Sequence, residues 1–200
     1  MSRLIYGLSA STVVVALAAS MVVQPVPRLI WNASASVPIG LYQVSPERQY
    51  ARGDLVAAMP PEPAATLLAE RDYLPRGVPL LKHIAAVSGE RVCRLGLRIT
   101  IDGHSAGKAR RRDGAGRILP HWQGCQKLKN GTLFLMNKSV PDSVDGRYFG
   151  LFATSTIIGR LTPIWTQGRA GQGFVWGIGA PVLIPAHHPI SFPNHPHKDL

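Results

Sequence analysis

Hydrophobic and polar positions divide the chain into an apolar beginning, a middle of short apolar segments and a tail where the pattern fades. Residues 4–23 form a run of twenty residues without a charge. Beyond it, apolar residues recur in short groups separated by Pro, Gly, Ser and Asp, which is typical of short strands joined by turns. Seventeen prolines and twenty glycines favour this interpretation over a helical bundle. We therefore expect a mainly β domain behind an apolar helix.

The apolar run has the length of a membrane span. A helix of this length would cover about 30 Å, one hydrocarbon thickness. Arg3 precedes the run and by the positive-inside rule would keep the N-terminus in the cytoplasm. We predict a single-pass anchor over residues 1–24 in the inner (cytoplasmic) membrane, with the remaining chain in the periplasm. The alternative is a cleaved signal peptide, because Ala16-Leu17-Ala18 resembles a cleavage site.

The pattern of apolar and turn residues in the middle of the chain predicts a series of short strands and one short helix, at 64–70. A hairpin is expected around Asp102-Gly103, because Asp-Gly favours tight turns. The predicted strands cover 41–44, 55–59, 79–87, 97–104, 131–137 and 152–165. We predict a globular domain over 25–165, followed by a Gly-, Pro- and His-rich extension over 166–200. The histidines of the extension lack the spacing of a metal site, so no metal is expected.

Charge and cysteine content limit the partners and the compartment. A net charge of +11 and a pI near 10.4 suggest nucleic acid or an anionic membrane as a neighbour. Since the basic residues are not interleaved with aromatic ones, we expect membrane proximity and no nucleic-acid partner. Cys93 and Cys125 form no Cys-x-x-Cys, which excludes a thioredoxin-like or zinc site. Outside the cytosol such a pair is usually a structural disulfide, which we predict here; the alternative is two buried free thiols. No cofactor is expected.

The segment at 34–42, Ser-Ala-Ser-Val-Pro-Ile-Gly-Leu-Tyr, contains the first candidate for chemistry. Hydroxyls two residues apart, at Ser34 and Ser36, would point to the same side of an extended chain. Pro38 and Gly40 can form a turn behind them. We interpret Ser36 as a nucleophile; the alternative is a membrane-proximal linker of the same composition.

Lys82 is the candidate partner of Ser36, because it interrupts the otherwise apolar strand predicted at 79–87. Burial lowers the pKa of a lysine, and a neutral amine beside a serine can accept the hydroxyl proton without a histidine. The alternative is a lysine on the polar face of an edge strand.

Three segments of the chain resemble the conserved boxes of the type I signal peptidases. They are Ser36 with its Pro-x-Gly, residues 81–90 (Leu-Lys-His-Ile-Ala-Ala-Val-Ser-Gly-Glu) and residues 142–150 (Asp-Ser-Val-Asp-Gly-Arg-Tyr-Phe-Gly). The branch with the greatest similarity is that of the TraF peptidases of conjugative transfer, and the resemblance covers 30–165. It implies a signal-peptidase-type coiled β-sheet or barrel catalytic domain on one N-terminal transmembrane helix.

The resemblance also implies roles for individual residues. Ser36 would be the nucleophile and Lys82 the general base. Ser34 would contribute its hydroxyl to the oxyanion hole, together with the backbone N–H of Ser36.

The third box supplies the supporting residues that the resemblance implies. Ser143 would orient the lysine, and Asp145 would support the site and pair with Arg147. Gly146 departs from the family, which usually has a second serine there, and His83 replaces a usual arginine and is assigned no role. The housekeeping branch has a methionine after the nucleophile, and this chain has none there, which favours the conjugative branch.

The expected activity is that of a serine endopeptidase with a Ser-Lys dyad. Its substrate would be a pilin-like or other exported precursor, and its partners would include conjugation or type IV secretion components. The resemblance leaves hydrolysis and cyclisation of the product open. The alternatives are a general type I signal peptidase and a non-catalytic component of a conjugation or secretion apparatus.

Overall fold

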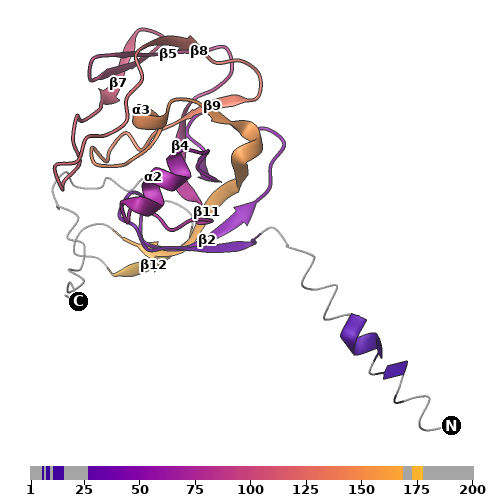
Figure 1. Cartoon of the computed structure of the whole chain (residues 1–200). Helices are drawn as coiled ribbons and strands as arrows, with labels where there is room; N and C mark the ends of the chain where they lie inside the picture. Colours follow the sequence, from indigo (N-terminus) through magenta and orange to yellow (C-terminus); the bar gives the residue numbers. More distant parts are fainter. Residues whose placement is uncertain (1–5, 7, 10, 16–26, 169–172, 178–200) are drawn as a thin grey trace.

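The computed structural model describes residues 6, 8, 9, 11–15, 27–168 and 173–177, and it confirms a mainly β body (Figure 1). The helices are α2 (Ala64–Glu70), as predicted, the short α3 (Gly146–Phe149) and the 3₁₀ turn η1 (Thr154–Thr156). The strands are β1 (Leu29–Asn32), β2 (Gly40–Ser45), β3 (Leu55–Ala58), β4 (Leu80–Ala86), β5 (Arg91–Leu95), β6 (Arg98–Ile101), β7 (His104–Lys108), β8 (Gly124–Lys127), β9 (Thr132–Leu135), β10 (Phe152–Ala153), β11 (Ile157–Gln167) and β12 (Phe174–Trp176).

The larger sheet curls into a half-barrel around the long strand β11. Its order is β1-β2-β11-β3-β4-β9-β10, with β12 paired to β11. One end of β11 pairs with β3 and the other with β2, and register shifts interrupt both ladders. Such irregularities bend a strand and increase its twist. Gly159 permits the close approach at this crossing, because a Cβ there would lie 2.7 Å from Val44 Cγ1.

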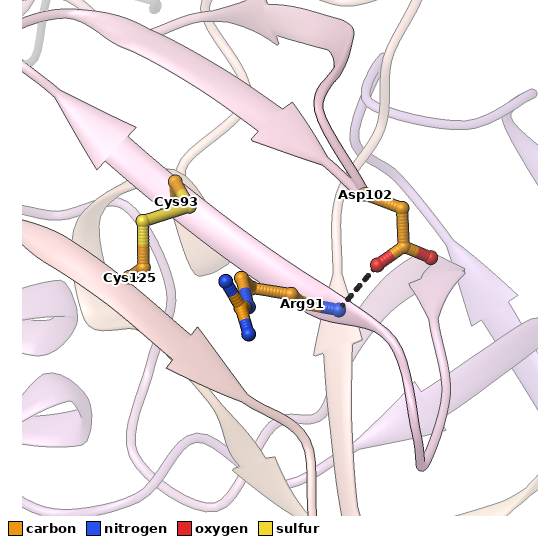
Figure 2. Close-up of a disulfide and its surroundings, with 4 residues drawn as sticks. All are labelled: Arg91, Cys93, Asp102 and Cys125. Carbon is orange, nitrogen blue, oxygen red and sulfur yellow. Dashed lines mark hydrogen bonds between the residues drawn. A yellow bond between two sulfur atoms is a disulfide. The ribbon is translucent and has the colours of Figure 1, made fainter.

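The smaller sheet has the order β7-β6-β5-β8 and contains the disulfide (Figure 2). Cys93 and Cys125 are direct partners in the β5–β8 register and are covalently joined, which confirms the predicted bond. The predicted hairpin is also present, with positive φ at Asp102 and Gly103. The Asp102 carboxylate accepts a hydrogen bond from the Arg91 N–H at 2.8 Å, which secures this turn to β5.

The two sheets are joined through a shared apolar core. Val92 and Ile99 of the smaller sheet pack with Ala86 of β4, Phe134 of β9 and Met136. A second cluster, including Val56, Leu68, Ile84 and Leu135, lies between the larger sheet and α2. Because β4 and β9 contribute to both clusters, the segments that follow them are placed where the sheets meet.

The described strands that the pattern did not predict include β1, β8 and β12. β12 lies within the predicted extension 166–200, yet it pairs with β11, and its Phe174 ring lies 4.7 Å from that of Trp165. Contact between these tilted aromatic rings, 38° apart, helps to attach this short strand. The four histidines of the extension lie outside the described residues.

Residues 6, 8, 9 and 11–15, in the predicted N-terminal anchor, are helical, and the rest of the predicted anchor is outside the described part. No described helix is both long and apolar enough to cross a membrane.

Candidate active site

Lys82 and Ser36 come together in the fold, and Ser143 contacts the same amine. The Lys82 Nζ donates hydrogen bonds to Ser36 Oγ at 3.3 Å and to Ser143 Oγ at 2.9 Å. The edge-strand alternative for Lys82 is wrong, because β4 is paired on one side with β3 and on the other with β9. Only 3% of Lys82 is exposed.

The surroundings of Lys82 favour its neutral form. Burial lowers the pKa of its amine to about 8, against a smaller opposing effect of the Asp145 charge, while Arg147 also lowers it. Removing an ammonium from water is costly, so the proton is held less tightly than in a solvated lysine. Among the described residues, no carboxylate forms an ion pair with Lys82. The amine is therefore poised to accept a proton near neutral or mildly alkaline pH.

Residues 33–39, which connect β1 to β2 and carry Ser34 and Ser36, form the serine loop. This loop is held together by Asn32, which ends β1 and is buried. Its Nδ2 donates to the carbonyl oxygens of Ser34 at 2.7 Å, Pro38 at 2.9 Å and Val37 at 3.1 Å. Its Oδ1 accepts from the N–H and the hydroxyl of Ser34, each at 3.1 Å. The Ser34 hydroxyl also lies 3.1 Å from Ser36 Oγ. Asn32 therefore brings the two hydroxyls that the sequence singled out side by side.

Gly40 and Tyr42, both in β2, fix the segment that follows the two serines. Gly40 has φ of +147°, and a Cβ there would lie 2.2 Å from the Trp165 carbonyl oxygen. Only glycine allows this approach of β2 to β11. The buried Tyr42 donates its hydroxyl to the Pro38 carbonyl at 2.6 Å. The predicted turn at Pro38–Gly40 is a bend at Ile39 instead, because Gly40 already begins β2; the turn of this segment lies at Ala35-Ser36.

The third box is organised by a buried ion pair between Asp145 and Arg147. Arg147 Nε lies 2.9 Å from Asp145 Oδ1, and Nη2 lies 3.0 Å from Oδ2. Nη2 also donates to the carbonyl oxygens of Val140 at 2.8 Å and Ser143 at 2.9 Å. Both charges are therefore compensated, and the arginine holds the loop from which Ser143 reaches Lys82.

The departure at Gly146 has a steric explanation. A Cβ at this position would lie 2.7 Å from both the Leu135 carbonyl oxygen and Phe134 Cε2. A serine would collide with β9 here, so glycine accommodates the buried Phe134 ring beneath α3.

Three buried polar residues of the site were missed from the sequence: Asn32, Asn137 and Arg94. Asn137 follows β9 and donates to the Ser36 carbonyl at 2.8 Å. Arg94, beside the disulfide in β5, donates to the Arg147 carbonyl oxygen and so links the smaller sheet to α3. Asparagine is common in turns, so neither asparagine was distinguishable from an ordinary loop residue. The only sequence feature that could have drawn attention to Arg94 was a charged residue next to Cys93 in an apolar segment.

A cleft of about 1220 Å³ opens beside Ser36. Its lining is mainly apolar and includes Val37, Leu55, Ile84 and Leu161 of the larger half of the domain. The β6–β7 hairpin contributes Ile101 and Ala106 to the lining as well. Sites for small molecules usually have about 300–1,000 Å³, so this cleft has room for a peptide segment. Within the described ranges, no three His, Cys, Asp or Glu side chains could together hold a metal ion.

Comparison with known proteins identifies the family. The model of the family described as signal peptidase, peptidase S26, matches residues 1–166. The conjugal transfer protein TraF of Agrobacterium fabrum is 37% identical over 145 residues, which cover 68% of this chain and 81% of that protein. The plasmid transfer protein TraF of Escherichia coli is 31% identical over 147 residues, with the same coverage of 68% and 81%.

A solved structure of a signal peptidase I from Enterococcus faecalis V583 is also similar. It has a TM-score of 0.35 and 20% identity, over 59% of this chain and 100% of that chain. The family match and the two TraF relatives, rather than this distant structural likeness, decide the assignment. The chain belongs to the signal peptidase family, peptidase S26.

Proposed function

We propose that this chain is a serine endopeptidase that processes a pilin-like or other exported precursor during conjugative transfer, with Ser36 as nucleophile and Lys82 as general base. One observation carries the proposal: a buried lysine with a lowered pKa contacts Ser36 Oγ at 3.3 Å, at the border of a peptide-sized cleft. The two TraF relatives, named for conjugal and plasmid transfer, support the biological setting.

Acylation begins when Ser36 Oγ attacks the carbonyl carbon of the scissile bond. The neutral Lys82 amine accepts the hydroxyl proton and passes it to the leaving amine nitrogen, which breaks the peptide bond. The separation of 3.3 Å is within the range that tightens when substrate binds. Ser143 orients the amine by accepting a hydrogen bond from it.

The oxyanion would be stabilised by the Ser36 N–H and the Ser34 hydroxyl. Within the described residues the Ser36 N–H makes no hydrogen bond, so it is available to a substrate. Ser34 Oγ lies beside the nucleophile, at 3.1 Å from its oxygen. Each such donor is typically worth about 3 kcal/mol in the transition state.

Deacylation can follow two routes that use the same lysine. Water activated by Lys82 would release a linear product, whereas the amino terminus of the substrate itself would release a cyclic one. The two products differ in mass by one water molecule, so mass spectrometry of the processed precursor distinguishes them.

The setting proposed for this reaction is the periplasmic face of the inner membrane. The uncharged run at 4–23 would anchor the chain. The disulfide between Cys93 and Cys125 is typical of an oxidising compartment. The partners would be the precursor and components of the conjugation apparatus.

The decisive test uses full-length Ser36→Ala and Lys82→Ala, each assayed for precursor processing and plasmid transfer. We expect both activities to be lost in both variants. Ser155→Ala, at an exposed residue of η1, serves as the control and should remain active. Full processing by either dyad variant would refute the mechanism, and cleavage of general secretory precursors instead of pilin would indicate a housekeeping signal peptidase.

A further inference from the structure

We propose that Asn137 is a positioning residue that sets the approach of Ser36 to Lys82. The inference rests on the proposed function, because it concerns the same dyad. Asn137 lies just beyond β9, at the point where the serine loop, β4 and the third box meet.

The side chain of Asn137 joins the nucleophile to the strand that carries the base. Its Nδ2 donates to the Ser36 carbonyl at 2.8 Å and to the Leu81 carbonyl at 3.2 Å. Its Oδ1 accepts from the His83 N–H at 3.1 Å and lies 3.2 Å from His83 Nδ1. Asn137 therefore hydrogen-bonds β4 at the residues before and after Lys82, and it binds Ser36 with the same amide group.

The backbone of Asn137 is itself fixed to the third box. Its N–H donates to Asp145 Oδ2 at 3.1 Å, and Asp145 is fully buried in its pair with Arg147. The preceding residue, Met136, donates its N–H to the His83 carbonyl at 2.9 Å. Asn137, which binds the Ser36 carbonyl, is thus itself held in place by the third box and by β4.

No other contact does the same work in the described part of the chain. Asn32 binds only within the serine loop itself. The Ser36 main chain makes one hydrogen bond to another segment, and its partner is Asn137. Among the described residues, Asn137 and Lys82 are therefore the two residues outside the serine loop that hydrogen-bond Ser36 itself, and the Lys82 contact is the longer one at 3.3 Å.

All hydrogen-bonding groups of the Asn137 side chain have protein partners, which distinguishes this residue from a loop asparagine in contact with water. Only 2% of the residue is exposed, and both amide hydrogens and the amide oxygen are engaged. An amide has two donors and one acceptor oxygen, so one residue meets all the requirements of this junction.

Kinetics provide the first readout. We expect Asn137→Ala to lower kcat by about 100-fold with little change in KM, since misplacing reacting groups by about 1 Å has this effect. Asn137→Ser, whose hydroxyl can keep one of the hydrogen bonds, should be affected less. Asn130→Ala is the matched control, because Asn130 is exposed and bonds only Ser88; it should retain full activity.

A thiol probe provides a readout that needs no substrate. In a Ser36→Cys background, the pH dependence of alkylation by iodoacetamide reports the thiol pKa. Beside the Lys82 amine, we expect this pKa to lie below the ordinary thiol value of about 8.5. Adding Asn137→Ala should raise it and slow alkylation at neutral pH, by about tenfold for each rise of one in the pKa. Adding Asn130→Ala should change nothing.

The outcomes separate this inference from the proposed function. An ordinary thiol pKa in Ser36→Cys alone would refute the dyad, and this inference with it. A lowered pKa that Asn137→Ala leaves unchanged, in a protein that still unfolds cooperatively, would refute the positioning role alone. If Asn137→Ala does not fold, Asn137→Ser decides in the same way, and an unchanged thiol profile there overturns the proposal.

Discussion

The Nζ atom of Lys82 lies 2.9 Å from the Oγ atom of Ser143, although 61 positions separate the two residues. Ser143 is held in turn by Arg147, which donates to its carbonyl oxygen at 2.9 Å. The amine therefore contacts two hydroxyls, those of Ser36 and Ser143. In the proposed mechanism, the contact with Ser143 orients the amine for proton transfer from Ser36.

Removing the Ser143 hydroxyl should impair catalysis without preventing folding. We expect Ser143→Ala to lower kcat for precursor cleavage by about 100-fold, because the amine loses the contact that orients it. Ser143→Thr keeps a hydroxyl and should retain more activity. Steady-state kinetics check this, with the exposed Ser155→Ala as control. Equal activity of Ser143→Ala and the unmodified chain would contradict the role of this contact.

The reaction should depend on pH through the neutral form of Lys82. Burial lowers the pKa of this amine to about 8, so kcat/KM should rise with pH and level off above that value. In the proposed mechanism the active form is the one with a neutral Lys82, and its fraction grows as pH increases through the pKa. Initial rates between about pH 6 and pH 10 test this. A rise complete below about pH 7 would instead indicate a histidine as the base.

Lys82 should also reduce the stability of the folded domain at neutral pH. Its pKa is about 8 when folded and near the ordinary lysine value of 10.5 when unfolded, so between these values the unfolded chain binds more protons and stability rises with pH. Below pH 8 the buried ammonium costs about 3 kcal/mol. We therefore expect Lys82→Met to be more stable than the unmodified chain at pH 7, by up to this amount.

Denaturant unfolding at two pH values measures this effect. The advantage of Lys82→Met should decrease as pH approaches 10, where the native amine is neutral in the folded state. Lys138→Met is the control, since Lys138 is exposed and next to the site, and it should show no such dependence. A constant difference in stability between pH 7 and pH 10 would show that burial does not lower the pKa of Lys82.

Breaking the Asp145–Arg147 pair should destabilise the domain strongly. Both side chains are at most 2% exposed, and removing one partner of such a pair typically costs about 3–5 kcal/mol, because the other charge remains buried. We expect Asp145→Asn to show this loss in denaturant unfolding. The double variant Asp145→Asn with Arg147→Met should lose less than the sum of the single changes.

An exposed pair provides the control for this experiment. Arg76 and Glu62 are 3.0 Å apart with 61% of each side chain exposed, so Glu62→Gln should change stability little. Additive losses in the Asp145 and Arg147 variants would show that the two charges do not stabilise each other.

Much of the fold could be predicted from the sequence because its signals are local. Alternation and turn residues predicted β2, β3, β4, β6, β9 and β11, the helix at 64–70 and the hairpin at Asp102-Gly103, but not β1 or β8. The aromatic strand at 174–176 was not predicted, because three residues in a glycine-rich tail form a strand only when β11 is present to pair with them. The same holds for Asn137, whose importance depends on Ser36 lying 101 positions away.

For the site, the residue types were evident from the sequence: two serines two positions apart, a lysine in an apolar segment and an Asp-x-Arg box. The order and spacing of these boxes also indicated the family. The burial of Lys82, in contrast, depends on β3 and β9 pairing on both sides of β4, so it emerged only from the folded structure. The tertiary structure likewise decided which groups meet, since hydrogen bonds between distant segments depend on how the sheets pack.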